Sequence, residues 1–534
     1  MGASLFPSRQ GGRILVEKLG VPVLADKPSS TRRPRGAPMQ VAEELPTASA
    51  PLEPGLTADV ARNTAVQLIG RFVTSFLSLG ALMILARALG TEATGDYFLV
   101  LSLLSLLNFS DMGITMLALR DLSLDRDKDE KSVILGHLVI MRTALAIGSA
   151  LIVCLLAAAL DYGMTVTVAL WIGSLSYLLL ALGPGGLGLT FAANLRMEYQ
   201  TLASVFQGVT FLLLAALVLV LNEGVIAVVV AYDLSLLAGF AATVVLSRRF
   251  LIPRFQPDRA YYRTFLYQSI PVVITYLAWL TYSRVDMVLL SKLTSSHEVG
   301  LYGMSYRFVD FFWPINTYFV ASVYPPLARH IHAGAHEAAR RLLQRSMDVL
   351  SVLVAPVVLV LFVFPESVLY VVGSDEFLEA ATSLRLLSIA IGLIAFSSLF
   401  SNAILAMGKQ QQIVWLMPVW VAFNIGLNLL LIPRIGFEAA ALTTLLTEFL
   451  VCNYLFILMV RNLRYQPSFT AIGRLVLVTS AGAAVALLVL PEIELLRATF
   501  LACVFAAAVS VSRIFDYGNV RRLARLCVSR LPAR

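Results

Sequence analysis

Apolar residues recur along the chain in stretches of about 20 residues, the length of helix that crosses the hydrocarbon core of a bilayer. Short polar breaks separate these stretches from about residue 64 to residue 512. The pattern predicts spans at 64–86, 97–119, 133–160, 165–191, 201–221, 225–246, 269–291, 299–324, 347–372, 382–407, 411–432, 437–460, 473–490 and 497–512. We therefore expect an all-α integral membrane protein with about fourteen transmembrane helices.

The composition agrees with a chain that lies mostly in lipid. Of the 534 residues, 58% are hydrophobic and 14% are charged, and the mean hydropathy is +0.80. Soluble globular domains contain about 25% charged residues. The formal net charge of +8 fits basic cytoplasmic loops that face anionic head groups. We expect membrane lipids as partners, and no nucleic acid.

Basic residues are distributed unevenly among the predicted loops. If the amino terminus lies inside, the inner loops hold most of the arginines and lysines, including those of 248–263 and 329–345. The outer loops hold few, among them Arg87 and Lys292. Because cytoplasmic loops are enriched in such residues, both termini are expected in the cytoplasm of a multi-pass protein of the cell (inner or plasma) membrane.

A faint repeat divides the chain into halves. Gly95 and Gly300 are separated by 205 positions, and so are Tyr97 and Tyr302. Duplicated halves are common in transporters, which place the substrate path between them. We expect a disordered cytoplasmic extension at 1–60, an N-terminal six-helix lobe at 61–250, a C-terminal six-helix lobe at 251–465, an additional transmembrane helix pair at 466–512 and a basic cytoplasmic tail at 513–534.

Three patterns that suggest cofactor or metal chemistry do not meet its requirements. The run Gly183-Pro-Gly-Gly186 lacks the preceding strand and following Lys-Ser/Thr of a phosphate loop, and it predicts a broken or kinked membrane helix instead. Three histidines at 330–336 lie in a basic loop without nearby cysteines. No Walker motif is present. We expect no cofactor, no metal site and no catalytic residues.

Charged residues inside the predicted spans are the candidate site. Placing a charged side chain in lipid costs on the order of several kcal/mol of free energy unless the side chain faces water or a partner. Such residues therefore mark substrate and ion pathways. The candidates for the substrate pathway are Arg71, Arg142, Arg284, Arg307, Gln67 and Asp286. The candidates for coupling or ion pairing are Asp111, Asp310 and Glu448. Gln67 and Arg71 are four residues apart, which places them on one polar stripe of the first span.

The arginines favour an anionic ligand, because guanidinium holds phosphate oxygens in bidentate geometry and keeps its charge. The alternative is an internal ion pair that only holds helices together, which Arg307 and Asp310 are suitably spaced to form. Arg284 and Asp286 are two residues apart and point different ways, so at least one needs a partner on another helix.

Three stretches resemble the polysaccharide and lipid-linked oligosaccharide flippases of the multidrug/oligosaccharidyl-lipid/polysaccharide exporter superfamily. The first contains Leu85-Ala-Arg-Ala-Leu-Gly90, Gly95-Asp-Tyr97 and Asp111-Met-Gly113. The second is 284–326, which ends in Tyr324-Pro-Pro326. The third runs from Asn424 to Glu448 and includes the Ile-Pro-Arg-Ile-Gly turn. The resemblance extends from about residue 60 to residue 460.

The resemblance implies a flippase that moves a polyprenyl-pyrophosphate-linked oligosaccharide, a polysaccharide repeat unit, across the cytoplasmic membrane by alternating access. It implies a polyprenyl-linked glycan as substrate and a polysaccharide polymerase or glycosyltransferases as partners. The alternative is a cation-coupled multidrug exporter of the same superfamily, which would favour an acid where the first span has Arg71. An enzyme is not expected, because no loop is long enough to form a catalytic domain.

Overall fold

The computed structural model describes residues 54–108, 118–119, 121–122, 127–256, 258–488 and 494–512. Its helices belong to one unit, Gly55–Arg534. Throughout these ranges the regular structure is helical and contains no strand. Within the described residues, nine continuous helical segments are long and apolar enough to cross a membrane, some of them joining several elements such as α5 to α7, and α18 and α19 contain shorter apolar stretches. The predicted all-α membrane class is confirmed, while the number of crossings stays a prediction.

The first two predicted spans are joined in one long helix, α2 (Pro54–Leu106), with a break at Gly90. Gly90 has φ of 73°, a left-handed conformation that glycine adopts without steric cost. The hydrophobic pattern predicts a loop between residues 86 and 97, whereas the structure continues as helix and turns the chain at Gly90 alone. Residues 109–117 of the second predicted span lie outside the described residues.

The rest of the first half follows the predicted windows. Its elements are α4 (Lys128–Ala159), α5 (Met164–Gly173), α6 (Leu175–Leu182), η1 (Gly183–Leu187), α7 (Leu189–Ala193), α8 (Met197–Leu221) and α9 (Val225–Ser247). Four of these, α5 to α7 with η1, occupy the single predicted span 165–191. The element η1 is a π-helix that contains Pro184 near its start, so the predicted broken helix at Gly183-Pro-Gly-Gly186 is confirmed.

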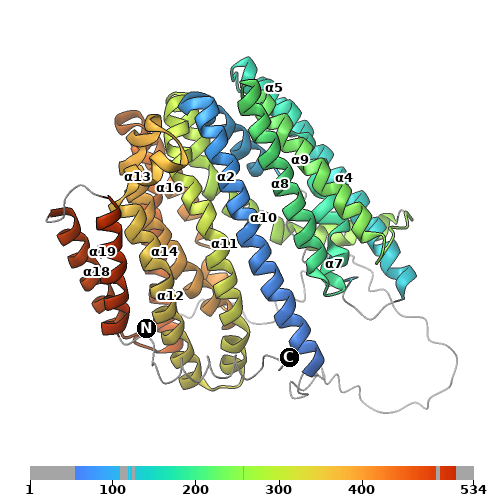
Figure 1. The fold of residues 1–534 in the computed structure, drawn as a ribbon. Coiled ribbons are helices and arrows are strands. Elements are labelled where there is room, and N and C mark those ends of the chain that lie inside the picture. The colour runs from blue at the N-terminus through green and yellow to red at the C-terminus, as the bar shows by residue number, and fades with distance from the viewer. Residues whose placement is uncertain are drawn as a thin grey trace, which may run out of the picture. The chain divides into compact units, whose positions relative to one another are not determined.

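The second half is also helical throughout its described residues. Its elements are α10 (Arg259–Leu293), α11 (Ser296–His332), α12 (His336–Val363), α13 (Pro365–Val372), the 3-10 helix η2 (Asp375–Ala380), α14 (Ala381–Ala406), α15 (Gln411–Val414), α16 (Met417–Ile435), α17 (Phe437–Leu463), α18 (Thr470–Leu488) and α19 (Glu494–Ser512). Figure 1 shows α18 and α19 beside each other at one edge of this group.

Helices pack mainly within each half. In the first half α8 lies against α9 and α4 against α6, and in the second half α14 lies against both α11 and α17. The pair α18 and α19 reaches the second half through α12. The long helix α2 contacts both groups, since Gly70 abuts Thr201 of α8 while Phe76 makes an edge-to-face contact with Phe311 of α11 (Figure 1).

The two glycines of the sequence repeat meet each other in the structure. A Cβ placed on Gly95 would lie 1.9 Å from the carbonyl oxygen of Ser296, and one on Gly300 would lie 2.1 Å from that of Thr91. Thr91 and Ser296 are themselves separated by 205 positions. The contact between α2 and α11 is therefore reciprocal, as in a two-fold interface, and small residues four apart let the two backbones touch.

Candidate functional site

Two arginines share one carboxylate at the contact between α10 and α11. Arg284 of α10 donates from both terminal nitrogens to the Asp310 carboxylate of α11, at 3.2 and 3.0 Å. The guanidinium of Arg307, one turn before Asp310, lies 3.7 Å from the same carboxylate. All three side chains are between 23% and 29% exposed. The cluster carries one positive charge in excess.

The two arginines are held differently. Arg284 has a charge-assisted, bidentate pair, the stronger kind of ionic contact, and its guanidinium lies 5.6 Å from the centre of the Tyr306 ring. Arg307 lies beyond hydrogen-bond distance of Asp310 and is placed over the Phe98 ring of α2, 4.7 Å from its centre. The predicted internal ion pair is present, yet it does not satisfy the donors of Arg307.

Asp286 points away from this cluster, as its spacing from Arg284 predicted. Its carboxylate accepts hydrogen bonds from the Tyr302 hydroxyl of α11 and from the Met287 amide at 2.8 Å. The Tyr302 hydroxyl also lies 3.4 Å from the Thr444 hydroxyl of α17. Each member of the pair thus has its partner on α11, Asp310 for the arginine and Tyr302 for the acid.

Glu448 of α17 belongs to the same interior. Its carboxylate accepts a hydrogen bond from the Tyr282 hydroxyl of α10 at 2.8 Å. Close by in the sequence, Thr447 lies 3.5 Å from the Asn424 amide of α16. A polar interior therefore joins α10, α11, α16 and α17, in which Asp310 pairs with arginines while Asp286 and Glu448 accept hydrogen bonds from tyrosine hydroxyls. Neither tyrosine is among the candidate site residues predicted above, although Tyr302 belongs to the sequence repeat and Tyr282 lies one turn before Asp286 on the seventh predicted span.

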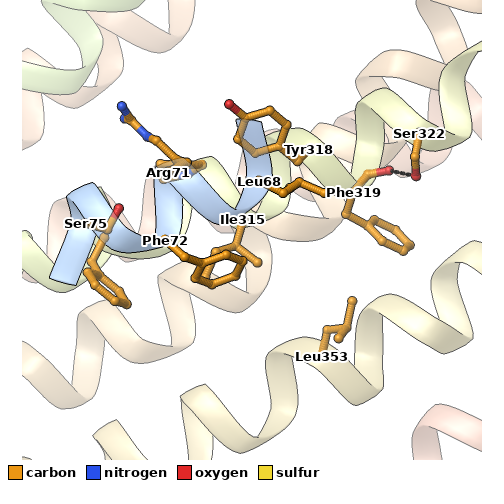
Figure 2. A pocket seen from close by; sticks show the side chains of 11 residues that line it. Leu68, Arg71, Phe72, Ser75, Ile315, Tyr318, Phe319, Ser322 and Leu353 are labelled. Atoms are coloured by element: carbon orange, nitrogen blue, oxygen red, sulfur yellow. Dashed lines mark hydrogen bonds between the residues drawn. The ribbon is translucent and has the colours of Figure 1, made fainter. Parts of the chain in front are cut away.

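Arg71 lies on α2 beside a cavity of about 240 Å³ between α2, α11 and α12. The walls are mostly apolar and include Phe72, Ile315 and Leu353. Figure 2 shows the Arg71 side chain extending away from Leu353, with its guanidinium on the same side as the Tyr318 hydroxyl. The side chain is exposed, and Gln67 one turn earlier is half-buried. The arrangement is an apolar slot with a cation at its edge.

The remaining predicted residues lie elsewhere. Arg142 of α4 is fully buried within the first half, where a Cβ on Gly185 of η1 would come 2.7 Å from its Cζ atom. Arg142 therefore packs against η1 and is not part of the arginine cluster on α10 and α11. Asp111 lies outside the described residues. The role of each predicted residue in transport stays a prediction.

One buried acid is not among the site residues predicted from the sequence. Asp233 of α9 is 5% exposed, and neither carboxylate oxygen has a hydrogen-bond partner among the described residues. It lies inside the predicted span 225–246, where a lone acid is itself the signal for a functional or costly residue. The first half thus carries a buried carboxylate of its own.

Comparison with known proteins places the chain in a family. A family model described as polysaccharide biosynthesis protein matches residues 60–331, and the MatE model matches residues 271–430. An uncharacterised membrane protein of Methanocaldococcus jannaschii is 26% identical over 100 residues, which is 19% of this chain and 20% of that relative.

Solved transporter structures share the fold at low identity. The lipid II flippase MurJ in an inward closed conformation superposes with a TM-score of 0.68 at 14% identity, covering 84% of this chain and 98% of that one. An inward-facing multidrug resistance MATE family transporter of the MOP superfamily superposes with a TM-score of 0.61 at 12% identity, covering 75% and 98%. The protein is a multi-pass membrane protein that shares the fold of these solved structures, and it belongs to the polysaccharide biosynthesis protein family.

Proposed function

We propose that the protein is a flippase that moves a polyprenyl-pyrophosphate-linked oligosaccharide from the inner to the outer leaflet of the cell membrane. The observation that carries the proposal is the excess guanidinium of the Arg284–Asp310–Arg307 cluster. Arg307 lies inside a predicted span and has no hydrogen-bond partner among the described residues, so it suits a ligand that brings multiple anionic oxygens. Family membership and the fold shared with the lipid II flippase support the same substrate class.

Arg307 is the residue best placed to grip the pyrophosphate. It keeps its donors available beside Phe98 of α2, whereas Arg284 is committed to Asp310. In this proposal Arg284 and Asp310 orient the cluster, and Arg307 contacts the ligand. Because Phe98 belongs to the first half and Arg307 to the second, relative movement of the halves would alter the surroundings of the guanidinium, as alternating access requires.

The cavity beside Arg71 suits the polyprenyl part of the substrate. Its apolar walls can cover hydrocarbon that remains in the lipid, while Arg71 at the edge attracts the charged head (Figure 2). Arg71 and Arg307 would then act in succession on one phosphate-bearing head. Gln67, Arg142 and Asp286 complete the proposed substrate pathway, and Asp111, Asp310 and Glu448 are proposed for coupling or ion pairing.

The proposed topology places both termini and the basic loops in the cytoplasm. Lobes at 61–250 and 251–465 would rock against each other, with the helix pair at 466–512 attached to the second lobe. Glycosyltransferases would supply the lipid-linked unit on the inner side, and a polymerase would use it on the outer side. We propose both as functional partners.

A cation-coupled multidrug exporter is the second candidate, favoured by the MatE match over residues 271–430. A cationic drug would need a negative site, and Asp286 and Glu448 are its candidates here. Both carboxylates already accept hydrogen bonds from tyrosines. Next to the Arg284–Asp310–Arg307 cluster the excess positive charge repels cations, which locally favours an anionic substrate.

Transport by purified protein in sealed vesicles tests the two candidates side by side. One assay follows a fluorescent oligosaccharide on polyprenyl pyrophosphate, whose label becomes accessible to a membrane-impermeant quencher after flipping. The other follows a lipophilic cationic dye under a sodium or proton gradient. Protein-dependent flipping without dye export supports the flippase. Dye export without flipping would overturn it in favour of the drug exporter.

A further inference from the structure

Two cations at one end of the helices bind carbonyl oxygens of the opposite half. Arg87, in the last turn of α2 before its break, donates to the carbonyl oxygens of Val371 and Gly373 at 2.8 and 3.0 Å. These carbonyls lie at the carboxyl end of α13 in the second half. Helix carboxyl ends present free carbonyls and the negative end of the helix dipole, so a cation is stabilised there.

Lys292 makes the corresponding contact in the other direction. It lies in the last turn of α10, in the second half, and its ammonium donates to the carbonyl oxygen of Leu160. Leu160 is the residue that closes α4 in the first half. The same ammonium lies 3.5 Å from the centre of the Tyr162 ring, and the Tyr162 hydroxyl is 3.4 Å from that of Ser291.

The two contacts are related by the internal repeat. Arg87 and Lys292 are separated by 205 positions, the spacing that relates Gly95 to Gly300. Each cation comes four residues before the small residue, Thr91 or Ser296, whose carbonyl oxygen touches the opposite glycine. In both halves, therefore, the cation lies one helical turn before the reciprocal α2–α11 contact, and it binds the carboxyl end of a helix in the other half.

We propose that Arg87 and Lys292 form a two-fold carbonyl clasp that holds this end of the transporter closed, and that both contacts are released when the end opens. The clasp consists of Arg87 with the Val371 and Gly373 carbonyls, and Lys292 with the Leu160 carbonyl. The clasp rests on the proposed function only for the side of the membrane on which it lies. In the topology proposed above, this end of the protein faces outside. Neither cation is needed to contact the substrate.

The two sides of the clasp are unequal. Arg87 uses two nitrogens on two carbonyls, a geometry that the single ammonium of lysine cannot reproduce. On the same side, Glu376 of η2 accepts a hydrogen bond from the Thr91 amide at 2.9 Å, which caps the α2 segment after the break. The Lys292 side has one carbonyl and one ring. Loss of Arg87 is therefore expected to loosen the closed end more than loss of Lys292.

The test measures a distance and needs no substrate. Spin labels are attached to cysteines introduced at Thr165 and Asp375, exposed residues of opposite halves, after the native cysteines are replaced. In full-length protein in lipid nanodiscs, Arg87→Ala and Lys292→Ala should each raise the long-distance population roughly 2- to 5-fold, as expected for exposed charges at helix ends. Arg87→Lys should recover part of the effect, and Lys292→Arg should retain the closed distribution.

Arg385→Ala provides the matched control. Arg385 also contacts a carbonyl and a carboxylate, those of Phe362 and Glu366, but both lie in its own half. Its removal should leave the distances unchanged. Unchanged distances in both clasp variants at normal membrane abundance, or an equal shift in Arg385→Ala, would overturn the clasp. A shifted distribution in a protein that flips no lipid-linked oligosaccharide would retain the clasp and reject the proposed substrate.

Discussion

Replacing Arg307 with alanine should weaken substrate binding strongly while leaving most of the fold intact. In the structure the guanidinium gains little from Asp310, which lies 3.7 Å away, and it is stacked over Phe98. Loss of the stacking should cost about 0.5–1 kcal/mol of stability. Loss of a charge-assisted contact to phosphate should cost about 1.5–3 kcal/mol of binding, roughly 10- to 100-fold in affinity. The effect on transport should therefore far exceed the effect on stability.

Initial flipping rates at several substrate concentrations, together with membrane abundance and thermal melting, provide the assay. Arg307→Lys should retain more activity than the alanine variant, since lysine keeps the positive charge and loses only the bidentate hydrogen-bonding geometry of the guanidinium. Arg284→Ala is the informative contrast: it removes the bidentate partner of Asp310 and should lower the melting midpoint more than Arg307→Ala does. Full flipping by an abundant Arg307→Ala protein would refute the assignment of Arg307 to the pyrophosphate.

Three further predictions follow from the fold and its topology. Reporter fusions at residue 62 and after residue 513 should read cytoplasmic and those within 161–164 external; an external carboxyl end would mean an odd number of spans. Gly95→Ala should lower the melting midpoint by the equivalent of about 1–3 kcal/mol because its Cβ would overlap the Ser296 carbonyl, whereas Gly148→Ala, with open space around it, should not. Glu448→Gln and Asp310→Asn should abolish gradient dependence of transport, and unchanged dependence in both would exclude a coupling role.

Much of the helical layout could be predicted because hydrophobic length alone determines it. The described helices occupy the predicted windows, and the break at Gly183-Pro-Gly-Gly186 was visible from residue types whose backbone preferences are strong. The loop expected between the first two spans was wrong because a single glycine with positive φ turns the chain. A local break in a helix was therefore predictable from a run of glycine and proline, but not from the single Gly90.

The partners within the site were less predictable, because they depend on contacts between helices. The sequence placed Arg307 and Asp310 one turn apart, and their ion pair follows from that spacing. That Arg284 would take both oxygens of Asp310 depends on how α10 lies against α11, which no local pattern records. For the same reason Arg142 could be recognised as a membrane-depth charge but not placed against η1.

The reciprocal contact of Gly95 with Gly300 also bears on ancestry. Had the two halves begun as identical separate chains in a homodimer, these glycines would have been one residue meeting its own copy at the symmetry axis. Gene duplication and fusion then leave each copy free to mutate alone. Close backbone contact removes that freedom here, because any side chain added on one half collides with the main chain of the other. The glycine contact at the former symmetry axis would then be preserved because no larger side chain fits there.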